Sequence, residues 1–212
     1  MDRGNEDQPK KEDQFDGTIR PLTLEDVDAL RPILEQWIRT VDKTAPRTED
    51  IDKTQESMRA TVRGENTRKY RVAEHDGKVI GVMGYKIPDP DDPIDGQKML
   101  AFKKSQHPVE FINAYVDEVH RGGKGVGTAL FRALEDLARQ QGFSEILVNS
   151  GPNFEKSGWE FWDTIMGSKK RDPIFDKGTI INHVGFAKDM YEPGRDAPVW
   201  RKPFYSRFAT RF

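Results

Sequence analysis

The chain has 212 residues, with 34 lysines and arginines against 36 aspartates and glutamates, so its net charge is −2. A charge this close to zero gives no reason to expect nucleic acid or an anionic membrane as a partner. The absence of cysteine excludes disulfides, thiolate catalysis and cysteine-ligated metals. Because no apolar run approaches the length of a membrane span and the amino terminus has no signal-peptide pattern, we expect a soluble, cytoplasmic protein.

The two ends of the chain differ in composition from the rest. Residues 1–16 carry nine charged side chains and almost nothing to bury, so we predict a disordered polar tail. A single domain is predicted over residues 17–204. Residues 205–212 form an aromatic and basic tail, which suits docking on its own domain or on a second copy in a homodimer better than stacking on single-stranded nucleic acid.

The domain is predicted to begin with a strand over residues 18–22. Thr23, followed three residues later by Asp26, predicts a capping box that opens a helix. The apolar residues of that helix, spaced to fall on one face, are Val27, Leu30, Ile33, Leu34, Trp37 and Ile38. A second, more polar helix is predicted over residues 49–63.

A hairpin follows, with strands over residues 70–74 and 79–87 joined at Asp76-Gly77, a strong signal for a two-residue turn. Residues 88–108 show no clear pattern apart from a short helix expected around residues 99–104. A segment of this length inside a domain is often functional. The segment contains four acidic residues, Asp89, Asp91, Asp92 and Asp95. Two interpretations are open: these residues attract a cationic amine substrate, or they belong to a solvated loop.

The next strand, over residues 109–119, leads into a loop with four glycines in six residues, and a helix then runs from Val126 to Gly142. Glycines let backbone N–H groups approach a ligand closely, and the helix directs the positive end of its dipole at the same spot. This arrangement predicts a cradle for a phosphate or pyrophosphate, to which Arg121 and Lys124 add positive charge.

Three alternatives compete for this loop. A P-loop requires Ser or Thr directly after Gly-Lys, but Gly125 follows Lys124. A Rossmann fingerprint requires an acidic residue at the end of the next strand, and that strand, residues 145–148, runs into Asn149-Ser150-Gly151. A plain glycine turn between a strand and a helix stays open as the third alternative.

The sequence from Val116 to Gly127 resembles motif A of the GNAT superfamily of N-acetyltransferases, with one extra glycine and Arg121 one residue early. The order of predicted elements over residues 17–150, with the strand 145–148 parallel to its predecessor, is similar too. The resemblance implies an α/β GNAT fold, a mixed central β-sheet flanked by helices, with splayed parallel strands at an acetyl-coenzyme A site. The coenzyme-binding residues that it implies are Val116, Arg121, Gly122, Gly123, Lys124, Gly125, Val126, Gly127, Thr128 and Asn153.

The resemblance also implies a function, transfer of an acetyl group from acetyl-coenzyme A to a primary amine of a small molecule or a peptide, by direct attack on the thioester (EC 2.3.1 class). The family uses a general base, often a carboxylate on the strand before the glycine loop. Glu110 is the first candidate, since its apolar neighbours would bury it; it could equally be a solvated strand-end carboxylate. Glu118 is the second candidate.

The general acid is harder to place. Phe161-Trp162 stands where the family has Phe-Tyr, and tryptophan cannot donate a proton as an acid. Tyr115, Tyr191 and Ser157 are substitutes, and a non-catalytic coenzyme A-binding regulatory module is the alternative function. The four histidines have no ligand spacing, so no metal site is expected. Beyond residue 167 we predict a charged loop over 168–177 and strands near 178–181, 183–191 and 198–204.

Overall fold

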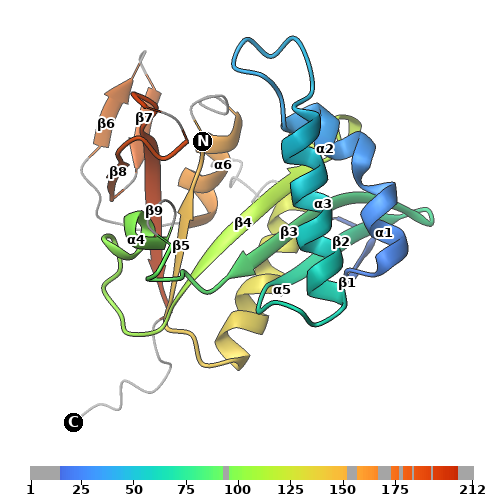
Figure 1. The fold of residues 1–212 in the computed structure, drawn as a ribbon, viewed down its shortest axis with the longest axis horizontal. Coiled ribbons are helices and arrows are strands. Elements are labelled where there is room, and N and C mark those ends of the chain that lie inside the picture. The colour runs from blue at the N-terminus through green and yellow to red at the C-terminus, as the bar shows by residue number, and fades with distance from the viewer. Residues whose placement is uncertain are drawn as a thin grey trace, which may run out of the picture.

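The computed structural model describes residues 15–92, 96–151, 157–166, 173–176, 179–182, 184–191 and 193–204. Its centre is a seven-stranded sheet with the strand order β1-β2-β3-β4-β5-β9-β8 (Figure 1). The pairing of β4 with β5 is parallel and the other neighbours pair antiparallel, which confirms the predicted mixed sheet. The strands are β1 Thr18–Pro21, β2 Lys69–His75, β3 Lys78–Lys86, β4 Pro108–Val116, β5 Glu145–Asn149, β8 Gly185–Ala187 and β9 Ala197–Pro203.

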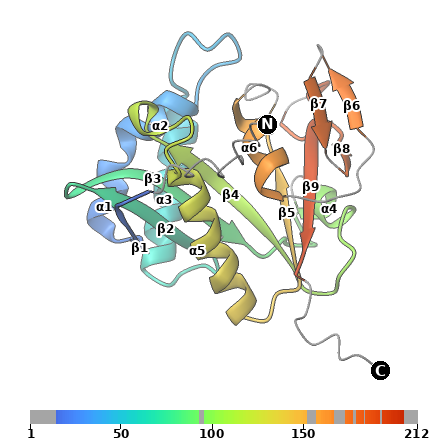
Figure 2. The ribbon, with the colours of Figure 1, turned by 180° about the vertical axis from the view of Figure 1, so that it is seen from behind.

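Helices cover both faces of this sheet. One face carries α1 Leu24–Ala29, α2 Arg31–Trp37 and α3 Thr48–Val62, and the opposite face, seen in Figure 2, carries α5 Val126–Gln140 and α6 Ser157–Met166. The short helix α4 spans Gly96–Leu100, and a 3-10 turn, η1, spans Glu118–His120 between β4 and α5. The strand, helices, hairpin, strand, loop, helix and strand follow one another in the predicted order.

The prediction of one helix that carries the apolar residues from Val27 to Ile38 is wrong, because the chain forms two helices there, with Leu30 between them. Pro32 lies in the first turn of α2. Proline has no N–H and its ring clashes with the preceding turn, so a continuous helix is interrupted at this point. The predicted capping box is confirmed, since the backbone N–H of Thr23 donates to Asp26 Oδ2 at 2.8 Å.

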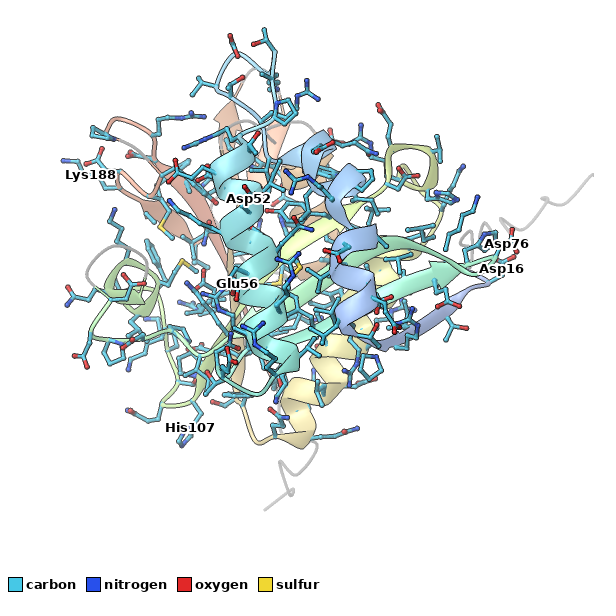
Figure 3. The ribbon with its side chains drawn as sticks, turned by 45° about the vertical axis from the view of Figure 1, so that its right-hand side comes forward. Asp16, Asp52, Glu56, Asp76, His107 and Lys188 are labelled. Atoms are coloured by element: carbon cyan, nitrogen blue, oxygen red, sulfur yellow. The ribbon has the colours of Figure 1, made fainter. Side chains whose placement is uncertain are left out.

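Other predicted elements agree closely or differ in extent. The hairpin turn has φ of 49° at Asp76 and 71° at Gly77, the left-handed conformation that its sequence favours. Figure 3 shows Asp76 beside Asp16 at this turn, and both carboxylates approach His75. The predicted loop over residues 168–177 is wrong in part, because β6 Pro173–Asp176 pairs with β7 Thr179–Asn182 in a separate ribbon.

The two tails fall almost entirely outside the described residues. Residues 1–14 and 205–212 are not described, so the disordered tail and the aromatic tail stay predictions. Phe15 is described and packs against the core, although it belongs to the predicted polar tail. The predicted strand over residues 183–191 is shorter in the structure, where β8 ends at Ala187.

Three apolar clusters bury the sheet. One lies between the sheet and α5 and α6, and it includes Phe111, Phe131 and Trp200. A second lies beneath α1–α3, and a third, around Met99 and Leu147, lies under α4. Because successive residues of a strand face opposite sides, β4 contributes to the first cluster through Phe111 while its neighbour Glu110 faces the other way.

A β-bulge bends β4 near its end. Ile112 pairs with Gly84 and Tyr115 with Val82, so two residues of β4 lie opposite the single residue between Val82 and Gly84. The extra residue, Asn113, has φ of 52° and accepts a hydrogen bond from the Tyr70 hydroxyl at 2.9 Å. The parallel pairing with β5 ends at Phe111 and Val148, just before the bulge. The two parallel strands therefore part at this point, as the resemblance implied.

The bulge gives a stability prediction. We expect Asn113→Val to lower the free energy of unfolding by about 1–3 kcal/mol, because a β-branched residue is strained at positive φ. Asn113→Gly should cost only about 1 kcal/mol, for the loss of the hydrogen bond from Tyr70 and of a weaker one to the Tyr115 hydroxyl at 3.5 Å. Urea denaturation of both variants measures the difference. Equal losses would show that the left-handed conformation at residue 113 does not matter.

Candidate active site

The glycine loop adopts the left-handed backbone conformation that glycine permits. Gly122, Gly123 and Gly125 have φ of 80°, 94° and 75°, in the left-handed region. A Cβ built on Gly122 or Gly123 would meet no described atom within 4 Å, so there is room beside the loop. Gly125 is the N-cap of α5, whose first N–H groups lack partners within the helix. The loop and the helix start together suit an anionic group.

The two cations of the loop are held near it by neighbouring groups. Arg121 forms an ion pair with Glu118 at 2.9 Å, and its guanidinium lies 4.8 Å from the centre of the Trp37 ring. The ammonium of Lys124 donates a hydrogen bond to the carbonyl of Val119 at 2.6 Å. The positive charges of Arg121 and Lys124 thus lie at the loop that precedes α5.

The end of α2 fixes the end of β4. Trp37 Nε1 donates to the carbonyl of Val116 at 2.8 Å, and the Gln36 side chain bonds Asp117 Oδ1 at 2.9 Å. The N–H of Asp117 donates to the Ile80 carbonyl on β3. Because the backbone groups of successive strand residues point to opposite sides, the N–H and C=O of Val116 point away from β3. They face the side on which β5 has separated from β4. The Val116 carbonyl on that side already accepts the hydrogen bond from Trp37.

Asp117 gives a pH-dependent prediction. Burial by itself would raise the pKa of this carboxyl, but hydrogen bonds from Gln36 and His120 outweigh it, and the pKa is lowered overall. Its stabilisation is therefore present above the pKa of an unfolded aspartate and is lost as the pH falls through the lower folded value. We expect Asp117→Ala to cost about 1–3 kcal/mol of unfolding free energy at pH 7.

The same cost should shrink as the pH falls below about 4, where the unfolded carboxyl takes up its proton. Urea denaturation of wild type and Asp117→Ala at several pH values measures this. A cost that stays constant over that range would contradict the proposed role of the charge.

Glu110 lies in the interior of the sheet, only 2% exposed. Its partner across the strand pair is Lys86 of β3, whose Nζ lies 3.4 Å from Glu110 Oε2. On the other side, Asn149 at the end of β5 donates from Nδ2 to Glu110 Oε1 at 3.0 Å. The carboxylate is one residue before Phe111, where the parallel pairing ends. Glu110 is thus a buried, doubly contacted carboxylate beside the point where the strands part.

Asn149 has a further partner from a distant part of the chain. The hydroxyl of Tyr191 donates to Asn149 Oδ1 at 2.5 Å, and Met99 Sδ of α4 lies 3.5 Å from Asn149 Nδ2. Tyr191 belongs to the segment between β8 and β9, which Lys98 ties to α4 through a 2.6 Å hydrogen bond to the Asp189 carbonyl. Lys188, labelled in Figure 3, lies in the same segment.

The other predicted catalytic residues lie elsewhere. The Glu118 side chain is 68% exposed and paired with Arg121. Tyr115 points toward α2 and α3, with its ring centre 6.2 Å from that of Trp37, and burial raises the pKa of its hydroxyl. Asn153 and the side chain of Ser157 lie outside the described residues.

The aromatic pair of α6 packs in the core, as one interpretation of the sequence held. Trp162 is 5% exposed, and its ring centre lies 6.3 Å from that of Phe131. Phe161 lies against Gly127 of α5, where an added Cβ would come within 3.0 Å of the phenyl ring. Across the part of the chain that the structure describes, no group of acidic or histidine side chains could hold a metal ion.

Sequence reasoning missed Lys86 and Asn149, and it weighed Tyr191 only as an acid. A signal for Asn149 existed, since ligand-binding side chains gather at the carboxyl ends of parallel strands, and Asn149 ends the strand beside Glu110. Nothing local marks Lys86 or Tyr191. Within the described ranges, no helix is long and apolar enough to cross a membrane.

The family model described as "Acetyltransferase (GNAT) family" matches residues 32–167, which is more than half of the chain. Human N-acetyltransferase 8 is 31% identical over 140 residues, covering 66% of this chain and 52% of that protein. Human N-acetyltransferase 8B is 32% identical over 139 residues, with the same coverage. The chain thus spans about half the length of these relatives.

Solved structures share the fold at low sequence identity. An N-acetyltransferase from Staphylococcus aureus Mu50 has a TM-score of 0.59 and 18% identity, covering 89% of this chain and 98% of that one. The ribosomal-protein-alanine N-acetyltransferase of Brucella melitensis has a TM-score of 0.56 and 21% identity, covering 88% and 99%. The PaiA N-acetyltransferase of Thermoplasma acidophilum, solved with coenzyme A, has a TM-score of 0.53 and 15% identity, covering 89% and 99%. By its family model, its relatives and its fold, the chain belongs to the GNAT acetyltransferase family.

Proposed function

We propose that this protein is an N-acetyltransferase that moves an acetyl group from acetyl-coenzyme A to a primary amine of a small molecule or a peptide. The observation that carries the proposal is the layout of β4. The strand holds a buried carboxylate, Glu110, beside the last parallel pair with β5, and its end leads into the glycine loop at the start of α5. One strand thus links a candidate base to a candidate anion site.

The residues present fit the coenzyme. The N–H groups from Gly122 to Thr128 would meet its pyrophosphate, with Arg121 and Lys124 near enough to add positive charge. The N–H of Val116 faces the side where β5 has parted, which suits an oxyanion-type contact to the acyl oxygen. Acetyl-coenzyme A supplies an acyl group already activated as a thioester. The Thermoplasma acidophilum neighbour was solved with coenzyme A, which supports this assignment.

Glu110 is the proposed general base. An acceptor amine arrives as an ammonium ion, and it can attack only after losing a proton. An ionised carboxylate held between Lys86 and Asn149 can accept that proton, and its burial keeps competing water away. Glu118, exposed and paired with Arg121, suits a role in positioning the loop better than a role as a base.

Tyr115 is the proposed proton donor to the departing thiolate. It lies on β4 beyond the last parallel pair, although its ring packs toward α2 and α3. Burial raises the pKa of its hydroxyl and so makes it a weaker acid than an ordinary tyrosine, and the proposal rests on its position along β4. Asn153 stays a predicted coenzyme contact, while the cytoplasmic location and the homodimer stay predictions from the sequence.

A second function, a coenzyme A-binding regulatory module, is favoured by one observation: Trp162 is buried in the core at the position where the family has a tyrosine. A thiol-release assay separates the two. Purified protein is incubated with acetyl-coenzyme A and a panel of small amines and amino-terminal peptides. Release that requires both an amine and Glu110 supports the enzyme. Coenzyme binding by calorimetry with no amine-dependent release would instead support the module.

A further inference from the structure

Four side chains form a continuous row across the sheet, from Lys86 through Glu110 and Asn149 to Tyr191. The contacts along this row, which we call the Glu110 row, are 3.4 Å, 3.0 Å and 2.5 Å. The first three residues come from the neighbouring strands β3, β4 and β5, and Tyr191 comes from the segment that precedes β9. The row lies on the face away from α5, since Phe111 and Val148 beside it face that helix.

The chemistry of the row fixes the direction of each hydrogen bond. An ionised carboxylate can only accept, so the Asn149 amide must turn its Nδ2 toward Glu110. This leaves Asn149 Oδ1, an acceptor, facing Tyr191, whose hydroxyl then donates. The requirements at the two ends agree, so both partners hold the amide in one orientation. A flipped amide would place Oδ1 against the carboxylate and leave Nδ2 at the hydroxyl.

We propose that Asn149, held by Tyr191, is a positioning residue that keeps the Glu110 carboxylate ionised and fixes its direction. A hydrogen bond donated to a carboxylate favours its charged form, and the donor here comes from a rigid strand end. Lys86 contacts the other carboxylate oxygen from β3. The catalytic meaning of this arrangement rests on the proposed function, whereas the effect on Glu110 itself does not.

The surroundings explain why Tyr191 can act on a buried group. Tyr191 is 51% exposed, but its hydroxyl donates to the Asn149 side chain at the end of β5. Its segment is tied down by Lys98, which bonds the Asp189 carbonyl, and by the Asp189 N–H, which bonds Asp196 Oδ1 at 2.9 Å. The groups that contact Glu110 and Asn149 include Lys86 from β3, Met99 from α4 and Tyr191.

Tyr191 also lies outside residues 32–167, the part of the chain that the family model matches. Asn149 lies inside it. The row therefore joins a family-matched strand to a segment that the family model does not cover, so a search for the family's own motifs would not find Tyr191.

The test is a direct titration of Glu110 in the ligand-free, full-length protein. Side-chain carboxyl signals are followed by carbon-13 NMR with labelled glutamate, and Glu110→Gln identifies the signal. We expect Asn149→Leu to move the titration midpoint of Glu110 to higher pH, and Tyr191→Phe to move it less, in the same direction. In the double variant, Tyr191→Phe should add nothing, because its effect passes through Asn149.

A matched control is Tyr85→Phe, which removes another tyrosine hydroxyl, bonded to Gln141 at 2.6 Å, and should leave the Glu110 midpoint unchanged. An unchanged midpoint in folded Asn149→Leu, or independent effects of the two substitutions, would overturn the inference. If Asn149→Leu does not fold, the test rests on Tyr191→Phe, whose half-exposed position tolerates the change. An unchanged Glu110 midpoint in Tyr191→Phe would then overturn the inference.

Activity then separates this inference from the proposed function. If Glu110 is the base, kcat/KM for a reactive amine should fall roughly threefold to tenfold in Asn149→Leu on the acid side of the pH profile, with little loss at high pH. A shifted NMR midpoint with an unshifted pH profile would leave the Glu110 row intact and would refute the assignment of Glu110 as the base.

Discussion

Glu110→Gln is expected to lower kcat/KM for amine acetylation by roughly 10²–10⁴-fold, the usual contribution of a general base. Glutamine keeps the shape of the side chain and can still meet Asn149, but it cannot take a proton at neutral pH. Binding of acetyl-coenzyme A should persist, because the glycine loop and the start of α5 are unchanged. Steady-state kinetics with a reactive amine, together with calorimetric titration of the coenzyme, measure the two effects.

Glu145→Gln is the matched control. Glu145 is also a buried carboxylate on the same sheet, 1% exposed at the start of β5, but its partners are the backbone N–H groups of Lys104 and Ser105 at 2.8 Å and 2.9 Å. It should cost about 1–3 kcal/mol of unfolding free energy with kcat/KM close to wild type. Glu110 would not be the base if its variant kept full activity, or if the control lost as much.

Gly125→Glu is expected to weaken binding of acetyl-coenzyme A by roughly 100-fold or more, about 3 kcal/mol. The new carboxylate would stand at the N-cap of α5, where the loop directs its N–H groups, and would repel the pyrophosphate. Residues other than glycine are strained at φ of 75°, so we also expect a loss of about 1–2 kcal/mol in unfolding free energy.

Gly142→Glu separates the strain from the site. Gly142 has φ of 82° and lies just beyond the opposite end of α5, so the substitution adds the same side chain at the same kind of backbone position. We expect a similar loss of stability, seen by thermal unfolding, with unchanged coenzyme affinity by calorimetry. Similar affinities for the two variants would mean that the glycine loop does not hold the coenzyme.

The glycine loop and its flanking elements could be predicted because their signals are local. Glycines at positive φ, a capping residue and apolar residues at helical spacing each act within a few residues of the chain. The hairpin at Asp76-Gly77 and the helix that ends at Gly142 are predicted for the same reason, and the structure places both as expected. The break between α1 and α2 at Pro32 also has a local signal. The prediction missed it because the apolar residues of the two helices fall on one continuous face.

The candidate site depended on tertiary structure to a greater extent. The sequence by itself determined the family fold, and it singled out the glycine loop as a candidate anion site and Glu110 as a candidate base, since these follow from the order of elements and from one motif. Whether Glu110 was buried or solvated could not be read locally. Its partner Asn149 is 39 residues away, and Tyr191 is a further 42 residues along the chain. Those separations are closed only when β5 and β9 join the sheet, so the environment of the carboxylate is a property of strand packing that no local pattern encodes.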